Sequence, residues 1–451
     1  MKAPEKSSAW KRHKKKIIAG ALLATATVGN KIDSTMTDKD LREVAAPTDT
    51  ERSFTLPEAP FTPEHLRPEY EKIAIRRDIY EGIAGTRHQI RKLAGFLLRA
   101  LPGIVKTKLS SREDISYSDL ENAGIQKESM AALVDLGAFD LQRLRAGDLD
   151  FSFLAKNGKE VILMEDRDPM FYLNYEGYQE EAVVPLNRHG NKKDQWTMAD
   201  MKKLVDGLHA AGIKVVIGFW GNTGNKDGNP FIKRNWQALK PVFPTSDDIN
   251  PLSFVKDAEG NEMPCADYIV KQYGKLNRDF GFDGLFLGDG LMGFRAFLDF
   301  DGPYQAADFR HLWTDFYKRI NKGVKSADAN DMLWAYDCMA NGTARARTNG
   351  LDLEGVAPFI DNYIFQSYSN DAWGGGYMNL PGYNLERDRA EIASLPPALK
   401  AKTRYSVGLG DSVEGWYGKK QAIRDKHGAM RDHAGKGTLG VWSNELIRGI
   451  L

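Results

Sequence analysis

From about residue 150 to the C-terminus, short apolar runs alternate with helical patterns that are apolar on one face. The clearest unit begins at Thr197, which has the spacing of a helix N-cap relative to Asp200. Apolar residues then recur at helical spacing until Gly212, which has the position of a helix-ending glycine. Residues 213–219 follow as an almost wholly apolar run, which is typical of a strand buried on both faces. This alternation predicts repeated strand and helix units around a parallel sheet.

Eight strands can be assigned from this pattern, although two segments compete for the first position. Because eight strands within about 290 residues match the size of a (β/α)8 TIM barrel, we predict an α/β fold of this type for residues 155–451. The alternative is a doubly wound open sheet, which is disfavoured because no glycine-rich phosphate-binding motif follows the first strand. The predicted strands are 161–164 or 170–173, then 182–186, 213–219, 284–287, 332–336, 362–365, 404–409 and 438–442.

The first 30 residues have the composition of a targeting segment. Five Lys or Arg residues between positions 11 and 16 precede a weakly apolar run, which contains the small residues Ala24-Thr25-Ala26. This is the order of a secretory signal, and the alternative is a disordered basic tail. The run is too short for a stable membrane span, and no other segment could provide one. We therefore expect a secreted or cell-surface protein.

Two further segments precede the predicted barrel. Residues 31–68 are polar and contain five prolines, which predicts a linker. Residues 69–150 are predicted to form a mostly helical accessory region, because Ile and Leu residues recur there at spacings of three, four and seven. A shorter helix is expected at residues 127–136. We find no catalytic pattern in this accessory region.

Charge and composition exclude some functions. Lys and Arg total 62 and Asp and Glu total 61, so a formal net charge of +1 gives no electrostatic case for nucleic acid. The two cysteines, Cys265 and Cys338, and the eight histidines match no metal-binding spacing, so we predict no metal and no cofactor. The nine tryptophans suit sugar binding, because pyranose rings stack on indole, although most Trp residues pack in cores.

Polar and aromatic residues follow the predicted strands, at the C-terminal ends where TIM barrels carry their active sites. Cleavage of a glycosidic bond requires one carboxylate to attack or to activate water, one carboxylic acid to protonate the leaving oxygen, and aromatic platforms for the ring. The predicted site comprises Asp289, Asp337 and Glu445 as catalytic candidates, and Trp220, Asn222, Gln366, Tyr368, Asp411, Trp416 and Trp442 as substrate-binding candidates.

Each carboxylate also has a structural interpretation. Asp289 could cap the turn that follows it, although the glycines beside it favour close approach of a ligand. Asp337 could form a turn, Asp411 could cap a helix, and Glu445 could complement the dipole of a last helix. Asp283 lies at the N-terminal end of the fourth predicted strand, where residues serve stability, and is predicted to be structural.

The run Gly281-Phe-Asp-Gly-Leu-Phe-Leu-Gly-Asp-Gly290 resembles the strand-four motif of retaining TIM-barrel glycosidases, the α-amylase-like and related α-glycosidases. The run His209-Ala-Ala-Gly-Ile-Lys-Val215 is similar to the passage into strand three of the same enzymes. In those families the Asp that ends strand four is the nucleophile, so the resemblance implies this role for Asp289. The chain departs from the α-amylase pattern in two places: no Arg lies two residues before Asp289, and strand five ends in Asp337 rather than Glu.

These observations predict a glycosidase, either a glycoside hydrolase or a transglycosidase, that acts on an oligo- or polysaccharide. Asp289 is the expected nucleophile, and the acid is Asp337, Asp411 or Glu445, with Asp337 as first choice. The alternative is a catalytically silent barrel that binds carbohydrate or serves as a surface structural protein. A Schiff-base enzyme is disfavoured because no Lys ends a predicted strand. Phosphorylated substrates are disfavoured because Asp411 and Glu414 would repel a phosphate.

Overall fold

The fold was analysed in a computed structural model of the 451-residue chain. The chain separates into two compact units, residues 1–55 and 56–451, and the described residues all belong to the second. Of Asp135, Asp337 and Trp442 only the backbone is described. The structure describes residues 61–75, 77, 118, 122, 130–136, 139–164, 184–185, 195–219, 221, 230–242, 248–288, 291, 309–337, 350–365, 392–408 and 438–442.

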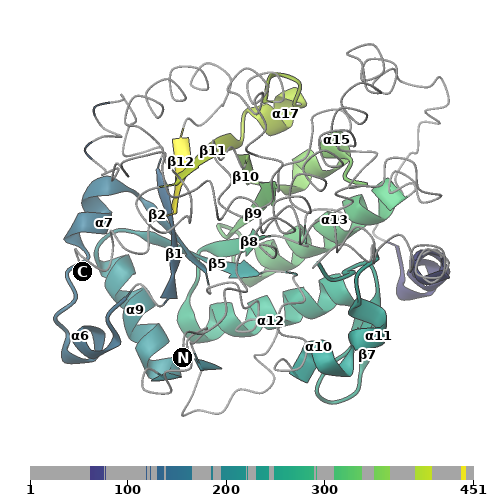
Figure 1. The fold of residues 1–451 in the computed structure, drawn as a ribbon, viewed down its shortest axis with the longest axis horizontal. Coiled ribbons are helices and arrows are strands. Elements are labelled where there is room, and N and C mark those ends of the chain that lie inside the picture. Colours follow the sequence, from purple (N-terminus) through teal and green to yellow (C-terminus); the bar gives the residue numbers. More distant parts are fainter. Residues whose placement is uncertain are drawn as a thin grey trace, which may run out of the picture. The chain divides into compact units, whose positions relative to one another are not determined.

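Eight parallel strands form a closed barrel, which confirms the predicted TIM-barrel fold (Figure 1). Around the barrel the order is β1, β12, β11, β10, β9, β8, β5 and β2, and each neighbouring pair is parallel. Two short antiparallel pairs lie outside it: β3 (Val184–Pro185) with β4 (Gln195–Trp196), and β6 (Phe254–Lys256) with β7 (Glu262–Pro264). The barrel strands are β1 (Ala131–Asp135), β2 (Glu160–Met164), β5 (Lys214–Phe219), β8 (Gly284–Leu287), β9 (Met332–Asp337), β10 (Asn362–Phe365), β11 (Thr403–Gly408) and β12 (Thr438–Trp442).

The beginning of the barrel differs from the prediction. Its first strand is β1, which lies where a helix was predicted at residues 127–136 and inside the predicted accessory region. The segment predicted as a first strand, 161–164, is part of the second strand, β2. The predicted second strand, 182–186, overlaps β3, which pairs with β4 outside the barrel. A short apolar run such as Ala-Ala-Leu-Val fits a helix or a strand equally well by periodicity, and here pairing with β2 and β12 makes it a strand.

Helices surround the barrel as an outer ring (Figure 1). In α9 (Met198–Ala210) Thr197 and Asp200 form the predicted capping box, and Gly212 follows with a φ of 75°, which favours glycine. The longest two helices described, α12 (Cys265–Phe280) and α13 (Arg310–Ala327), each bury one apolar face. The shorter ones are α6 (Leu141–Ala146), α7 (Ser152–Asn157), α10 (Pro230–Arg234), α11 (Trp236–Leu239), α15 (Leu353–Val356), the 3-10 helix η7 (Ala357–Phe359) and α17 (Pro397–Lys400).

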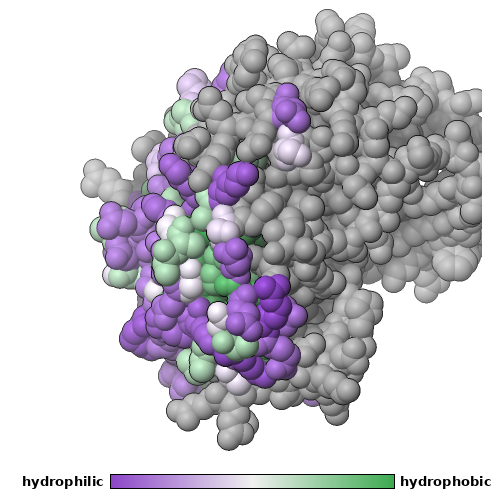
Figure 2. All heavy atoms as spheres, turned by 90° about the vertical axis from the view of Figure 1, so that its left-hand side faces the viewer, coloured by the Kyte–Doolittle hydropathy of each residue, from purple (hydrophilic) through white to green (hydrophobic). Residues whose placement is uncertain are grey.

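The outward faces of these helices are polar. Figure 2 shows the side that carries α6, α7 and α9, where hydrophilic residues cover most of the coloured surface around a small apolar area. Among the residues that the structure describes, Ile75 is the only large apolar side chain that is well exposed. Within the same residues, no helix combines the length and the apolar character that crossing a membrane requires.

A helix precedes the barrel at residues 63–75, so the predicted linker at 31–68 is wrong for its last six positions. Pro63 is the first helical residue, and the carbonyl of Thr62 accepts the first helical hydrogen bonds, from His65 and Leu66. Proline is favoured at this first position, because its missing N–H would have no helical partner. A proline that the sequence analysis read as a linker signal therefore begins a helix.

This helix is attached to the barrel unit by specific contacts. The backbone N–H of Phe61 donates to Asp315 Oδ1 of α13 at 2.9 Å. The guanidinium of Arg67 pairs with Glu262 of β7 at 2.6 Å and lies 4.2 Å from the ring centre of Phe254 in β6. Apolar residues of the helix are buried in the main core. Residues before the first strand thus cover part of the outer ring.

The barrel separates two apolar cores. The larger core lies between the strands and the surrounding helices, and it includes Leu285 and Leu287 of β8 and Leu333 and Ala335 of β9. The smaller core fills the barrel interior, because alternate residues of a strand face opposite sides of the sheet. Its members are Ala131, Leu133, Ile162, Val216, Phe286, Trp334, Tyr336 and Ile364. Membership of the two cores therefore identifies the inner and outer positions of β1, β2, β5, β8, β9 and β10.

Candidate functional site at the barrel rim

The fourth barrel strand, β8, reaches the C-terminal rim just before Asp289. The N–H of Gly288 still pairs with the carbonyl of Phe219 in β5 at 2.8 Å, and the N–H of Leu291 donates to the carbonyl of Gly288 at 3.1 Å. Strand pairing thus extends at least to Gly288. The following candidates lie outside the described residues: Asp289, Trp220, Asn222, Gln366, Tyr368, Asp411, Trp416 and Glu445.

Asp337 occupies the last position of β9, within the strand. Trp334 and Tyr336 belong to the interior core, and Leu333 and Ala335 belong to the outer core. Strand alternation therefore gives position 337 the outer face, and its register partner is Phe365 of β10. The first-choice acid thus stands on the side of β9 that faces the helices.

Trp442 occupies the last position of β12, on the inner face. Its register partner in β1 is Leu133, which belongs to the interior core, and neighbouring residues in register share a face. Its partner on the other side is Gly408, the last residue of β11. Position 442 is therefore suited to the rim of a site inside the barrel mouth, next to a strand that ends in glycine.

Asp135 is a rim carboxylate that the sequence analysis missed. It is the last residue of β1 and pairs in register with Met164, the last residue of β2. Because Ala131 and Leu133 belong to the interior core, position 135 has the inner face. The available signal was an apolar run that ends in Asp, and assigning this run to a helix removed it from the set of strand ends.

The interior below the rim is a packed core that includes one ion pair. The rings of Phe286 and Tyr336 lie 5.5 Å apart, and Trp334 is fully buried beside them. Arg404 of β11 lies 4.8 Å from the ring centre of Trp334 and pairs with Glu160 of β2 at 2.8 Å. Both charged side chains are largely buried. The described inner positions at this level are therefore occupied by packed side chains, and the candidate site lies above them, at the rim.

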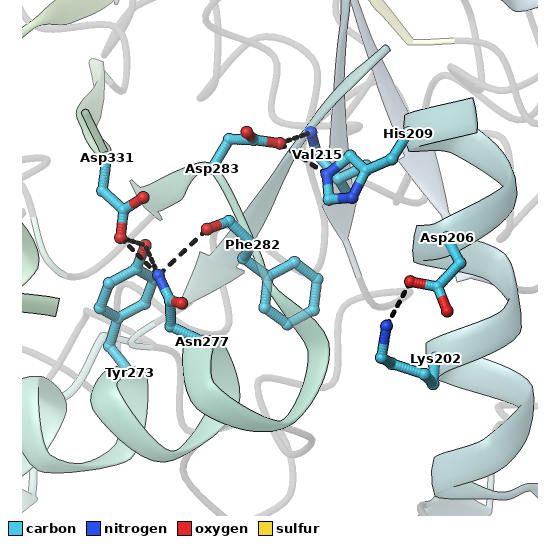
Figure 3. Close-up of polar contacts among 9 residues, drawn as sticks. All are labelled: Lys202, Asp206, His209, Val215, Tyr273, Asn277, Phe282, Asp283 and Asp331. Atoms are coloured by element: carbon cyan, nitrogen blue, oxygen red, sulfur yellow. Dashed lines mark hydrogen bonds and ion pairs between the residues drawn. The ribbon is translucent and has the colours of Figure 1, made fainter. Parts of the chain in front are cut away.

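The N-terminal end of the barrel carries a polar network (Figure 3). Asp283 Oδ2 accepts the backbone N–H of Val215 at 2.7 Å and lies 2.8 Å from His209 Nε2. Asp283 therefore joins the start of β8 to the start of β5 and to the end of α9. This arrangement confirms the structural role predicted for Asp283.

A second carboxylate completes this network (Figure 3). Tyr273 Oη donates to Asp331 Oδ2 at 2.6 Å. The amide of Asn277 donates to the same carboxylate, and also to the carbonyl of Phe282 at 3.1 Å. Burial raises the pKa of Asp331 to about 6, and the nearby negative charges of Asp328 and Asp283 act in the same direction. These bonds hold α12 against the turn that leads into β8.

No cluster of three or more His, Cys, Asp or Glu side chains that could hold a metal ion occurs in the part of the chain that the structure describes. Most of the rim candidates lie outside that part. The carboxylate clusters that the structure does describe are at the N-terminal end and in the outer ring, where protein donors occupy them.

Comparisons with known proteins give structural neighbours only. No protein-family model matches the chain, and no curated protein matches it. A class V chitinase from Pseudomonas fluorescens is 12% identical and has a TM-score of 0.41, over 70% of this chain and 95% of that chain. A GH18 chitinase from Pseudoalteromonas aurantia is 13% identical, with a TM-score of 0.38, over 71% and 98%. An α-amylase from Lactobacillus plantarum is 13% identical, with a TM-score of 0.39, over 69% and 70%.

These neighbours are glycoside hydrolases of two kinds, chitinases and α-amylases. Their identities to this chain indicate no particular family. The barrel itself is established by the strand order of this chain, and it does not depend on the superpositions.

Proposed function

We propose that the chain is a glycoside hydrolase or transglycosidase that acts on an oligo- or polysaccharide at the C-terminal rim of the barrel. One observation carries this proposal. The segment that resembles the strand-four motif of retaining glycosidases is itself the fourth barrel strand, β8, and its described pairing runs as far as Gly288. Asp289 is the next residue along the chain. TIM-barrel enzymes take their catalytic residues from this place.

In the proposed mechanism Asp289 attacks the anomeric carbon, and a second rim carboxyl group protonates the leaving oxygen. Two carboxyl groups that share a pocket do not both ionise easily, so one has a raised pKa and keeps its proton. A retaining reaction needs the two groups about 5–5.5 Å apart, whereas an inverting reaction needs about 6.5–9.5 Å to admit water. The sequence resemblance favours retention.

Substrate contacts are proposed for the aromatic and polar residues of the rim. Trp442 has an inner position at the end of β12, which suits a platform for a sugar ring. Trp220, Asn222, Gln366, Tyr368, Asp411 and Trp416 are proposed to contribute stacking or hydrogen bonds, on the basis of their positions after strands. Secretion directed by residues 1–30 would bring the enzyme to extracellular polysaccharides, and an intact Met1 on exported protein would contradict cleavage of that segment.

The proposal is tested with Asp289→Asn, because amide and carboxylate have nearly the same shape. Turnover of aryl glycosides and oligosaccharides should fall by about 10⁴-fold or more, because no covalent intermediate can form. The melting temperature should stay close to that of the unchanged protein. Asp148→Asn is the matched control, since Asp148 is exposed and lies after α6. Full turnover by Asp289→Asn on a confirmed substrate would end the proposal.

A second candidate function is a silent barrel that binds carbohydrate without cleaving it. It is favoured because neither β8 nor β9 has a carboxylate at an inner position near the rim. Glycine occupies position 288, the inner position that follows Phe286, and Asp337 has an outer position. Sugar binding measured by calorimetry, together with no turnover on any glycoside tested, would establish this second function. Turnover of any glycoside that Asp289→Asn loses would exclude it.

A further inference from the structure

We infer that Asp135 supplies the general acid/base carboxyl group of the rim site. This inference rests on the proposed glycosidase function and names the second carboxylate that the function requires. Asp135 ends β1, and its position shares the inner face of Ala131 and Leu133. The outer face of the same strand is occupied by Ala132 and Val134, which belong to the larger core. Because inner and outer residues alternate along all of β1, position 135 is assigned to the inner face, at the barrel mouth.

The register of β1 places position 135 at the rim. Leu133 is level with Trp442 on β12, so Asp135 lies two residues further towards the C-terminal end. With strands about 4.8 Å apart and about 3.3 Å per residue, the Cα atoms of Asp135 and Trp442 are about 8 Å apart. A carboxylate position thus lies above and beside an aromatic position on the same inner face. This pairing suits a sugar ring held next to an acid.

The strand order also relates Asp135 to the proposed nucleophile. Going round the barrel, β1 is separated from β8 by β2 and β5, so the two strands lie on nearly opposite sides. The interior of an eight-stranded barrel is just wide enough for inward side chains from opposite strands to meet. Position 135 therefore lies across the barrel mouth from the end of β8, the strand after which Asp289 follows in the sequence.

The other described carboxylates of the barrel strands and of their N-terminal turns do not fit this role. Asp337 has an outer position on β9. Glu160 is on an inner face, but it begins β2 and pairs with Arg404 below the interior core. Asp283 and Asp331 lie at the N-terminal end with protein donors on them. Among the strand ends that the structure describes, Asp135 is the one carboxylate that has both the inner face and the C-terminal end.

The chemical step balances with these two groups. The Asp135 carboxyl group transfers its proton to the glycosidic oxygen while the bond from that oxygen to the anomeric carbon breaks, and the leaving alcohol departs neutral. The Asp289 carboxylate forms the new bond to the anomeric carbon. Water then replaces Asp289 at that carbon and gives its proton back to Asp135. Both carboxyl groups end as they began, and no oxidant or cofactor is needed.

The test compares Asp135→Asn with the unchanged protein on two sets of aryl glycosides. Phenyl glycosides need a proton on the leaving oxygen, whereas 2,4-dinitrophenyl glycosides leave readily without one. Panels of both anomers of glucose, N-acetylglucosamine, galactose and mannose supply the probes. We expect turnover of the phenyl substrates to fall by about 10²–10⁴-fold. With azide present, turnover of the dinitrophenyl substrates should fall by about tenfold at most, and a glycosyl azide should form, because azide needs no base.

Each other outcome has a meaning. If the unchanged protein hydrolyses no member of either panel and no oligosaccharide, the proposed function fails and this inference fails with it. If the unchanged protein is active and Asp135→Asn loses both substrate sets without azide rescue, or loses neither, the function stands and the inference is overturned. Asp135→Glu provides a second variant if the amide disturbs folding. Because it keeps a carboxyl group, its turnover should still fall at high pH, where the general acid loses its proton. Asp148→Asn, an exposed aspartate of the same half of the chain, should match the unchanged protein.

Discussion

Two aspartates of one motif lie at opposite ends of the same barrel strand. Asp283 precedes β8 at the N-terminal end, where its Oδ2 accepts the Val215 N–H and contacts His209. Asp289 follows β8 in the sequence, one residue beyond Gly288, whose N–H still pairs with β5. The N-terminal end thus uses its carboxylates to join strands and helices. The C-terminal end has inner positions, among them those of Asp135 and Trp442, above the interior core. If the proposed function holds, residues that serve stability and residues that serve chemistry are separated along the barrel axis.

The largest expected effect on stability comes from breaking the ion pair inside the barrel. Arg404→Ala would leave Glu160 buried without its partner, which costs about 3–5 kcal/mol in the free energy of unfolding. Urea unfolding measures this cost. Lys202→Ala is the matched control, because Lys202 pairs with Asp206 on the exposed face of α9, and such pairs contribute about 0.5 kcal/mol or less. Equal costs for the two variants would mean that the interior pair is not buried as described.

A smaller effect is expected on the free energy of oligosaccharide binding at the rim. Trp442→Ala should weaken oligosaccharide binding by about 1–3 kcal/mol, because an aromatic platform is lost while the strand is kept. Calorimetry with oligosaccharides of glucose and of N-acetylglucosamine measures the loss. Trp442→Phe should recover part of the affinity. Unchanged binding in the Ala variant would remove Trp442 from the site.

The N-terminal network predicts a pH dependence of stability. The folded-state pKa of Asp331, about 6, is above its usual value near 3.8, so the folded protein binds more protons than the unfolded chain between these pH values. The contribution of this group to stability is therefore lost as pH rises from about 4 to about 6. Asp331→Asn should remove that decline, by about 1–2 kcal/mol across the window. Parallel stability curves for the two proteins would contradict the raised pKa.

The smallest effect is expected for Asp337→Asn. Position 337 has the outer face of β9, so turnover should change by about tenfold or less. The same assay applied to Asp135→Asn should show the much larger loss described above. A large loss for Asp337→Asn with none for Asp135→Asn would reverse the assignment of inner and outer faces at the rim.

Several later barrel strands were predicted well because the sequence of a strand inside a barrel is apolar along most of its length. The strands at 284–287, 362–365 and 438–442 were predicted with the bounds that the structure has. Such strands read as continuous apolar runs, which a solvent-exposed strand or helix does not produce. The β1 segment was missed because its five residues satisfy a helical and an extended pattern equally well.

The site was harder to predict because the face of a strand end depends on its neighbours. A shift of one residue in register moves every side chain of a strand to the other side of the sheet. Such a shift in β9 would place Asp337 on the inner face and Tyr336 on the outer face. Only the pairing of β9 with β8 and β10 decides between them. The Glu160–Arg404 pair joins residues 244 positions apart, which no local pattern indicates.

Covalent labelling of Asp289 tests the central claim most directly. The protein is incubated with activated 2-fluoro and 5-fluoro glycosyl fluorides, which form the glycosyl-enzyme but hydrolyse slowly, and its peptides are then analysed by mass spectrometry. We predict that the peptide containing Asp289 gains the mass of one fluoro-sugar and that Asp289→Asn gains none. An active protein that carries the label on another carboxylate, or that hydrolyses glycosides without ever being labelled, would contradict the assignment of Asp289 as nucleophile.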